Sequence, residues 1–108
     1  MSTYSVGACP ANPFIYNVMM TLADTEYSQQ LPRSCKKYLI HTRDESEFRL
    51  AFATGIVAVP AGAYLTVLEG TRFYEETVNL RVVNADWDGT LYFASDVTLK
   101  VIEIVAWT

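Results

Sequence analysis

Apolar and polar residues alternate along most of this chain, and a period of two is the signature of a β-strand with one buried face. The clearest example is segment 47–53. Phe48, Leu50 and Phe52 share one face there, and Glu47 and Arg49 lie on the other. We expect the aromatic side of this strand to face a core. No stretch of the chain shows a convincing helical period.

Further segments have the same character and are rich in β-branched and aromatic residues. They are 18–22, 27–31, 37–42, 64–68, 77–83, 91–94 and 98–107. Turn-forming residues separate them and recur every ~8–12 residues, the spacing of an all-β sandwich or barrel. With 108 residues, the chain is long enough for one domain. We therefore predict an all-β, single-domain antiparallel β-sandwich over residues 17–108, either jelly-roll or Ig-like.

The first sixteen residues differ from the rest, because Gly7 and Pro10 interrupt any regular pattern and yet several side chains are apolar. We interpret residues 1–16 as an extended N-terminal arm. An exposed arm of this composition would leave apolar surface in water, so it either folds back on its own domain or lies against a neighbour. The residues of the arm that we expect to make contacts are Pro13, Phe14, Ile15 and Tyr16.

The last predicted strand is apolar on both faces, which indicates that both faces are covered. One face holds Leu99, Val101, Val105 and Trp107, and the other holds Ile102, Ile104 and Ala106. A partner subunit or the N-terminal arm could provide the second cover. We expect Ile102, Ile104 and Trp107 to contact a partner. Glu103 lies among the apolar residues of the first face, so it needs either a charged partner or a position at the rim of an interface.

Charge and composition exclude several classes of function. The net charge is −4 and the pI is about 4.8, so the chain has too few cations for a nucleic-acid surface. The N-terminus lacks the basic and apolar regions of a secretory signal. The most apolar window, 56–68, contains Pro60 and Gly62 and is shorter than the ~20 residues of a membrane helix. We expect neither nucleic acid nor membrane as a partner.

The cysteines and acidic residues suggest no cofactor. Cys9 and Cys35 form no CxxC pair and have no histidine nearby to complete a zinc site. We interpret them as reduced thiols, and a bridge between them stays open. The segment Asp86-x-Asp88-Gly89 resembles part of a calcium loop but lacks the later bidentate glutamate. We predict no metal site and no cofactor.

No catalytic motif accompanies the single histidine, His41: HExxH, P-loop, GxGxxG and nucleophile-elbow patterns are all missing. We therefore expect no catalytic residues. Trp87 lies at an expected loop tip between two aspartates. It could cap the edge of the sandwich, contact a partner or stack on a sugar, and we keep it as a candidate contact residue.

Several short segments together resemble a family of small virion structural proteins of tailed bacteriophages. The resemblance spans residues 21–108 and leaves out the first twenty. The segments are Thr25-Glu26-Tyr27-Ser28 with Leu31-Pro32, Lys36-Lys37-Tyr38-Leu39-Ile40 with Arg43, Leu50-Ala51-Phe52, Tyr64-Leu65-Thr66, Phe73-Tyr74-Glu75-Glu76, Thr90-Leu91-Tyr92-Phe93-Ala94-Ser95, and Val101-Ile102-Glu103-Ile104-Val105-Ala106-Trp107-Thr108.

The resemblance implies a non-enzymatic β-sandwich protein made in the host cytoplasm and assembled into the virion. The version we favour is a capsid decoration or cement protein on the outer head surface, which bridges neighbouring copies of the major capsid protein. A homo-oligomer is expected, with a trimer favoured because capsid decoration often sits at three-fold positions. Two alternatives stay open: a neck, tail or fibre-adaptor protein of the virion, and a carbohydrate-binding module that uses Trp87.

Overall fold

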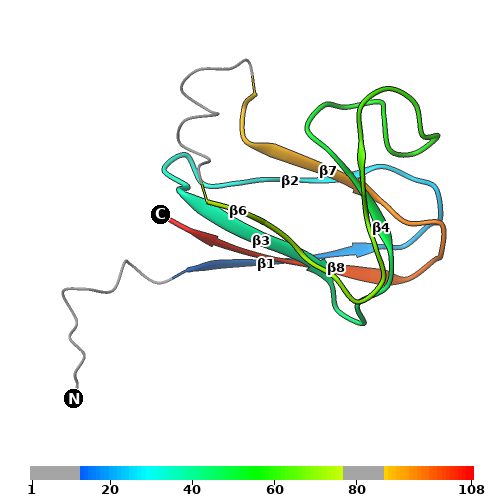
Figure 1. The fold of residues 1–108 in the computed structure, drawn as a ribbon, viewed down its shortest axis with the longest axis horizontal. Helices are drawn as coiled ribbons and strands as arrows, with labels where there is room; N and C mark the ends of the chain where they lie inside the picture. Colours follow the sequence, from blue (N-terminus) through cyan, green and yellow to red (C-terminus); the bar gives the residue numbers. More distant parts are fainter. Residues whose placement is uncertain (1–12, 77–86) are drawn as a thin grey trace.

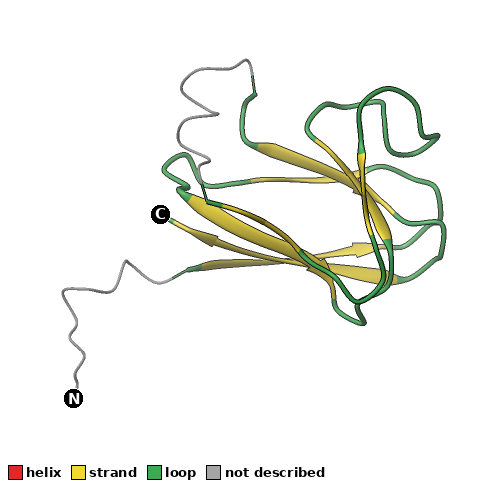
Figure 2. Cartoon of the chain, in the orientation of Figure 1, coloured by secondary structure: helices red, strands yellow, loops and turns green. Residues whose placement is uncertain are grey.

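A computed structural model describes residues 13–76 and 87–108, and the described residues are strands, turns and loops without a helix (Figures 1 and 2). The strands are β1 (Phe14–Met20), β2 (Tyr27–Gln30), β3 (Lys37–Thr42), β4 (Phe48–Ala51), β5 (Leu65–Val67), β6 (Phe73–Glu75), β7 (Thr90–Ala94) and β8 (Lys100–Trp107). The predicted all-β class is confirmed. The predicted strand at 77–83 lies outside the described residues.

The strands form two four-stranded antiparallel sheets, in the orders β1-β8-β3-β6 and β2-β7-β4-β5. Consecutive strands alternate between the sheets except for β4 and β5, which are neighbours in one sheet. The first half of the chain pairs with the second half in reverse: β1 with β8, β2 with β7, β3 with β6 and β4 with β5. This nested pairing is that of a long hairpin rolled up into a sandwich. Of the two predicted architectures, the strand order is therefore that of the jelly roll.

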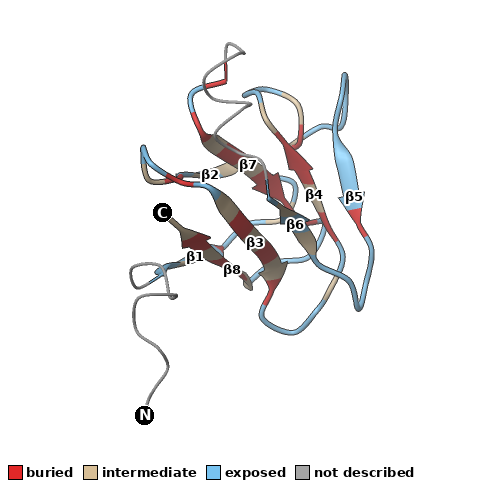
Figure 3. Ribbon diagram, turned by 60° about the vertical axis from the view of Figure 1, so that its left-hand side comes forward, coloured by how far each residue is buried: buried red, intermediate tan, exposed pale blue. Residues whose placement is uncertain are grey.

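The core lies between the two sheets, where alternate side chains of each strand meet. Tyr38, Ile40, Leu91 and Phe93 are all 0% exposed. Figure 3 shows this alternation as bands of buried residues along β3, β7 and β8. In β4, Phe48 is 1% and Leu50 0% exposed, which confirms the predicted inward face of this segment. Phe52 follows the strand and packs against the same core while remaining partly exposed.

The first strand begins at Phe14, directly after Pro13, which cannot donate a backbone hydrogen bond to a ladder. Phe14, Ile15 and Tyr16 pair with Ala106, Val105 and Ile104 of β8. The expected boundary between an arm ending at residue 16 and a sandwich beginning at residue 17 thus falls inside β1. These three residues fold back on their own domain, which is one of the two possibilities that the sequence left open.

The loop between β4 and β5 covers part of the outer face of the β2-β7-β4-β5 sheet, over β4 and β7. Val57 of this loop is 0% exposed and packs on Ala51 and Ala94, which form a second, smaller core outside the sandwich. Arg49 fastens the loop, because its Nε donates to the Val57 carbonyl at 2.7 Å. The loop needs glycine at Gly62, where φ is +75°.

Candidate functional site

The described loops leave the outer face of the β1-β8-β3-β6 sheet uncovered, and we call it the open face. Cross-strand register defines it, because directly paired residues of an antiparallel sheet point to the same side. Its residues are Ile15, Asn17 and Met19 of β1; Val101, Glu103, Val105 and Trp107 of β8; Lys37, Leu39 and His41 of β3; and Tyr74 of β6.

Apolar side chains dominate the open face. Ile15 is 65% exposed, Met19 51% and Tyr74 46%. Ile15, Val105, Leu39 and Tyr74 lie directly opposite one another on successive strands, so they form one apolar row across the whole sheet. Contiguous apolar surface of this kind on a folded domain is typical of a protein interaction site.

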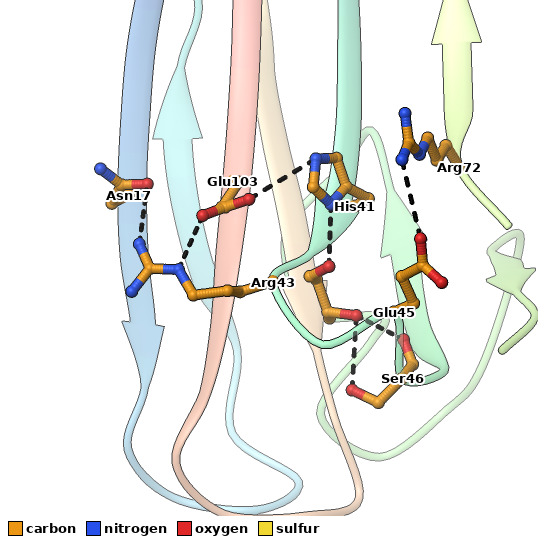
Figure 4. Close-up of polar contacts among 8 residues, drawn as sticks. Asn17, His41, Arg43, Glu45, Ser46, Arg72 and Glu103 are labelled. Carbon is orange, nitrogen blue, oxygen red and sulfur yellow. Dashed lines mark hydrogen bonds and ion pairs between the residues drawn. The ribbon is translucent and has the colours of Figure 1, made fainter. Parts of the chain in front are cut away.

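A polar strip crosses the same face next to this row (Figure 4). Arg43 Nε donates to Glu103 Oε2 at 2.7 Å, and Arg43 Nη2 donates to Asn17 Oδ1 at 3.4 Å. On the other side of Glu103, its Oε1 lies 3.6 Å from His41 Nε2. Glu103 thus has two cationic or potentially cationic neighbours, which answers the sequence-based question of how it is accommodated. The Glu103 side chain is 28% exposed, a rim-like position rather than a core one.

His41 has an acceptor at each ring nitrogen. Its Nδ1 donates to the Thr42 carbonyl at 2.8 Å, and its Nε2 faces Glu103. This histidine therefore belongs to the same surface network as Glu103 and Arg43. The described residues around it supply no nucleophile in hydrogen-bonding distance.

At the edges of the open face, charged groups lie against aromatic rings. Lys37 Nζ lies 5.2 Å from the centroid of the Trp107 ring, within the range of a cation–π contact. Tyr74 donates from its hydroxyl to Glu76 Oε1 at 3.1 Å. Desolvation and then the Glu76 carboxylate raise the pKa of Tyr74, so this ring stays a neutral phenol at physiological pH.

Ile102 and Ile104 are not contact residues, and this expectation was wrong. Both are 0% exposed and lie in the core between the sheets. The opposite face of β8 is the outer one, because a strand in a sandwich exposes only alternate residues. Trp107 does lie on the open face and is partly exposed, so it remains available for contact.

Trp87 is buried rather than presented at a loop tip. It is 9% exposed and its indole Nε1 donates to the Thr90 carbonyl at 2.7 Å. The Phe52 ring packs edge-on against it, with ring centroids 5.3 Å apart. Of the three roles considered, Trp87 caps the edge of the sandwich. It offers neither a partner contact nor an open ring for a sugar.

The four residues predicted from the arm have different positions. Pro13 is exposed and precedes β1, and Phe14 is 46% exposed at the start of the strand. Ile15 lies on the open face, whereas Tyr16 points inward and packs against the core. The structure therefore brings only Ile15 and Trp107 of the predicted contact residues onto the open face.

Sequence reasoning missed the remaining apolar residues of the open face and its polar strip. Glu103 was the available signal. An acidic residue in the middle of a strand marks the side that reaches water, so the face of β8 that contains Glu103 had to be the outer one.

A small pocket lies where the β4–β5 loop meets edge strand β5. It has a volume of about 240 Å³ and is lined by Leu50, Phe52, Ala63, Tyr64 and Leu65. All of these side chains are apolar except for the Tyr64 hydroxyl, so the pocket lacks acid, base or metal ligands.

The described residues show no arrangement suited to metal binding: in residues 13–76 and 87–108, His, Cys, Asp and Glu do not gather in groups of three or more. Asp88, part of the calcium-like segment, accepts a hydrogen bond from the Thr90 backbone at 3.0 Å as an ordinary turn residue. Cys35 is a free, buried thiol, and burial raises its pKa. Within the same ranges, no helix is long and apolar enough to cross a bilayer.

Comparisons of the chain with protein-family models, with curated proteins and with solved structures found no match. The open face therefore has to be interpreted from its own geometry.

Proposed function

We propose that this chain is a non-enzymatic structural protein of a phage particle, and specifically a decoration protein that docks its open face on the major capsid protein of the outer head surface. The observation that supports docking is the apolar row of Ile15, Val105, Leu39 and Tyr74, which crosses a whole sheet and has no cover from the described chain. The segments that resemble small virion structural proteins support the assignment to a phage particle.

The chemistry of the open face fits a protein partner. An apolar centre with a polar strip and aromatic residues is the usual composition of a protein–protein interface. Arg43 and Glu103 already neutralise each other at 2.7 Å, so the strip presents little net charge to attract a polyanion. The jelly roll also occurs in viral capsid domains and in lectins, an analogy of fold that by itself assigns no function.

Docking through one small face is weak for a single copy. Decoration supplies many copies to a repeating surface, and a particle held through many such contacts gains stability by avidity. The proposed role thus requires only a moderately apolar face, which is what the sheet offers.

Co-sedimentation with tailless heads of the phage that encodes the chain tests this proposal. We expect saturable binding at many copies per head, counted by quantitative gel. Val105→Lys places a charge at the centre of the apolar row and should weaken binding at least tenfold. Thr66→Lys is the matched control, because Thr66 is an exposed strand residue on the outer face of the other sheet, and it should bind like the unmodified chain.

Each other outcome rejects part of the proposal. Binding to purified tails but not to heads would replace decoration by a neck, tail or fibre-adaptor role. Equal binding by both variants would show that the open face is not the docking site. Binding to neither heads nor tails would overturn the virion assignment.

A further inference from the structure

The four edge strands of the sandwich are protected to different degrees. An exposed edge presents unpaired backbone groups, and proteins blunt such edges with short strands, charges, prolines or bulges. Edge strands β2, β5 and β6 have four, three and three residues in the described chain. By contrast, β1 has seven residues, FIYNVMM, with neither charge nor proline, and its register with β8 runs without a bulge from Phe14 to Met20.

The register also shows which backbone groups of β1 face outward. Arg43 N–H donates to the Val101 carbonyl at 2.8 Å, which directs the backbone of Val101 towards β3. Because these groups alternate along a strand, Ile102, Ile104 and Ala106 direct theirs towards β1. Their partners on β1 are Val18, Tyr16 and Phe14. It follows that the N–H and C=O groups of Ile15, Asn17 and Met19 point to the edge of the sheet, where no described strand pairs with β1.

The sequence of β1 is compatible with itself when a second β1 is laid antiparallel against this edge. With a two-fold axis at Asn17, Ile15 lies opposite Met19 of the other copy and Asn17 lies opposite itself. On the inner side, Tyr16 meets Val18 and Phe14 meets Met20. Every pair is apolar except the neutral central pair, so no like charges meet. In this register the outward N–H and C=O groups of Ile15, Asn17 and Met19 all pair within the two β1 strands.

We propose that two copies of this chain pair through antiparallel β1 edges, centred on Asn17, into a two-fold dimer with a continuous eight-stranded sheet. A second copy is the occupant that the edge itself indicates, because the strand is chemically symmetric about its central residue. The pairing joins two open faces into one larger surface. It stands independently of the virion proposal, and its two-fold symmetry gives a dimer in place of the trimer that the resemblance implied.

Sedimentation equilibrium over a concentration range that reaches about 1 mM measures the association. We expect a concentration-dependent monomer–dimer equilibrium. Asn17→Pro removes an N–H that faces the free edge, a position where an edge strand tolerates proline. The monomer should therefore stay folded by circular dichroism while self-association weakens at least tenfold. Asn17→Ala keeps the N–H and is the matched control, which should dimerise like the parent.

A cross-link provides a second measurement that does not depend on tolerance of proline. In the proposed register Asn17 lies opposite its copy within the ~4.4–6.8 Å Cα separation that a disulfide spans. On a Cys9→Ser background, Asn17→Cys should form a covalent dimer under mild oxidation. Ser28→Cys, on the edge strand β2 of the other sheet, should not.

Three results would overturn the proposal: a monomer at every concentration, a trimer, or a dimer that Asn17→Pro leaves unchanged and Asn17→Cys does not cross-link. None of these results bears on head binding, so failure of the dimer and failure of the decoration role can be told apart.

Discussion

The outer faces of the two sheets differ in how far the described chain covers them. On the β2-β7-β4-β5 sheet, Ala51 and Ala94 are 1% and 0% exposed, because the β4–β5 loop lays Val57 over them. On the β1-β8-β3-β6 sheet, Ile15 and Met19 are 65% and 51% exposed. The described chain thus covers part of one outer face itself and leaves the more apolar strands of the other one open.

Side-chain size and one arginine explain the difference. Small alanines allow a loop to approach the sheet closely, and Arg49 holds the loop carbonyls of Val57 and Ala58 at 2.7 and 3.4 Å. Asp24 lies 3.0 Å from the same guanidinium. The open face has large side chains instead and no comparable anchor among the described loops. A loop can therefore cover a sheet face only where small side chains leave space for it and a group such as Arg49 anchors it, in addition to apolar residues that pack.

The largest effect should separate the two sides of β8. Ile104→Ala removes a fully buried side chain and should lower the free energy of unfolding by about 2–5 kcal/mol. Val105→Ala, one residue further and on the open face, should cost below about 1 kcal/mol. Urea denaturation measures both. Equal losses would mean that the open face is covered in solution.

The next largest effect on stability tests whether the β4–β5 loop packs over the sheet. Val57→Ala should cost about 1–3 kcal/mol, because Val57 is 0% exposed against the sheet. Val59→Ala in the same loop is the control, since Val59 is 80% exposed, and it should change the stability by no more than ~0.5 kcal/mol. If the two variants unfold at the same urea concentration, the loop does not form a second core.

A smaller effect concerns the polar strip of the open face. A double-mutant cycle with Glu103→Gln and Arg43→Gln should give a coupling energy of about 0.2–1 kcal/mol, because the Arg43 side chain is 57% exposed and water screens the pair. The coupling should shrink as salt is added. A coupling that is insensitive to salt would contradict a solvent-exposed strip.

The smallest effect is a pH dependence at the end of the same sheet. Hydrogen bonds from Lys100 and Ser46 hold the pKa of Asp44 below its ordinary range. A carboxyl with a lowered folded pKa contributes stability above its unfolded pKa, and this contribution disappears as the pH falls below about 4.

The Asp44 side chain is 50% exposed, so the loss should stay below about 1 kcal/mol after screening. Asp44→Asn should be less stable near neutral pH and should lose less on acidification. Thermal melts at pH 7 and pH 3 measure the difference, and parallel melts for both chains would rule out this contribution.

Alternation alone predicted the class of the fold. It placed strands at 37–42 and 91–94, which are β3 and all but the first residue of β7, and it gave the inward face of Phe48 and Leu50. It missed β6 as a strand, because Phe73–Glu75 is too short to display a period. It also could not assign partners to strands, since β1 and β8 lie at opposite ends of the chain and nothing local records their register.

The candidate site was harder to predict for the same physical reason. A strand that is apolar on both sides, such as β8, has two faces that look alike in sequence, and only packing against the second sheet decided that Ile102 and Ile104 are inside. For Trp87 the sequence left capping, partner contact and sugar stacking open, and the contacts with Phe52 and the Thr90 carbonyl favour capping. The sequence by itself determined that this protein is a β-sandwich, because side-chain period is a local property. Tertiary structure alone decided which face stays open, because burial depends on strands and loops that are far apart in the chain.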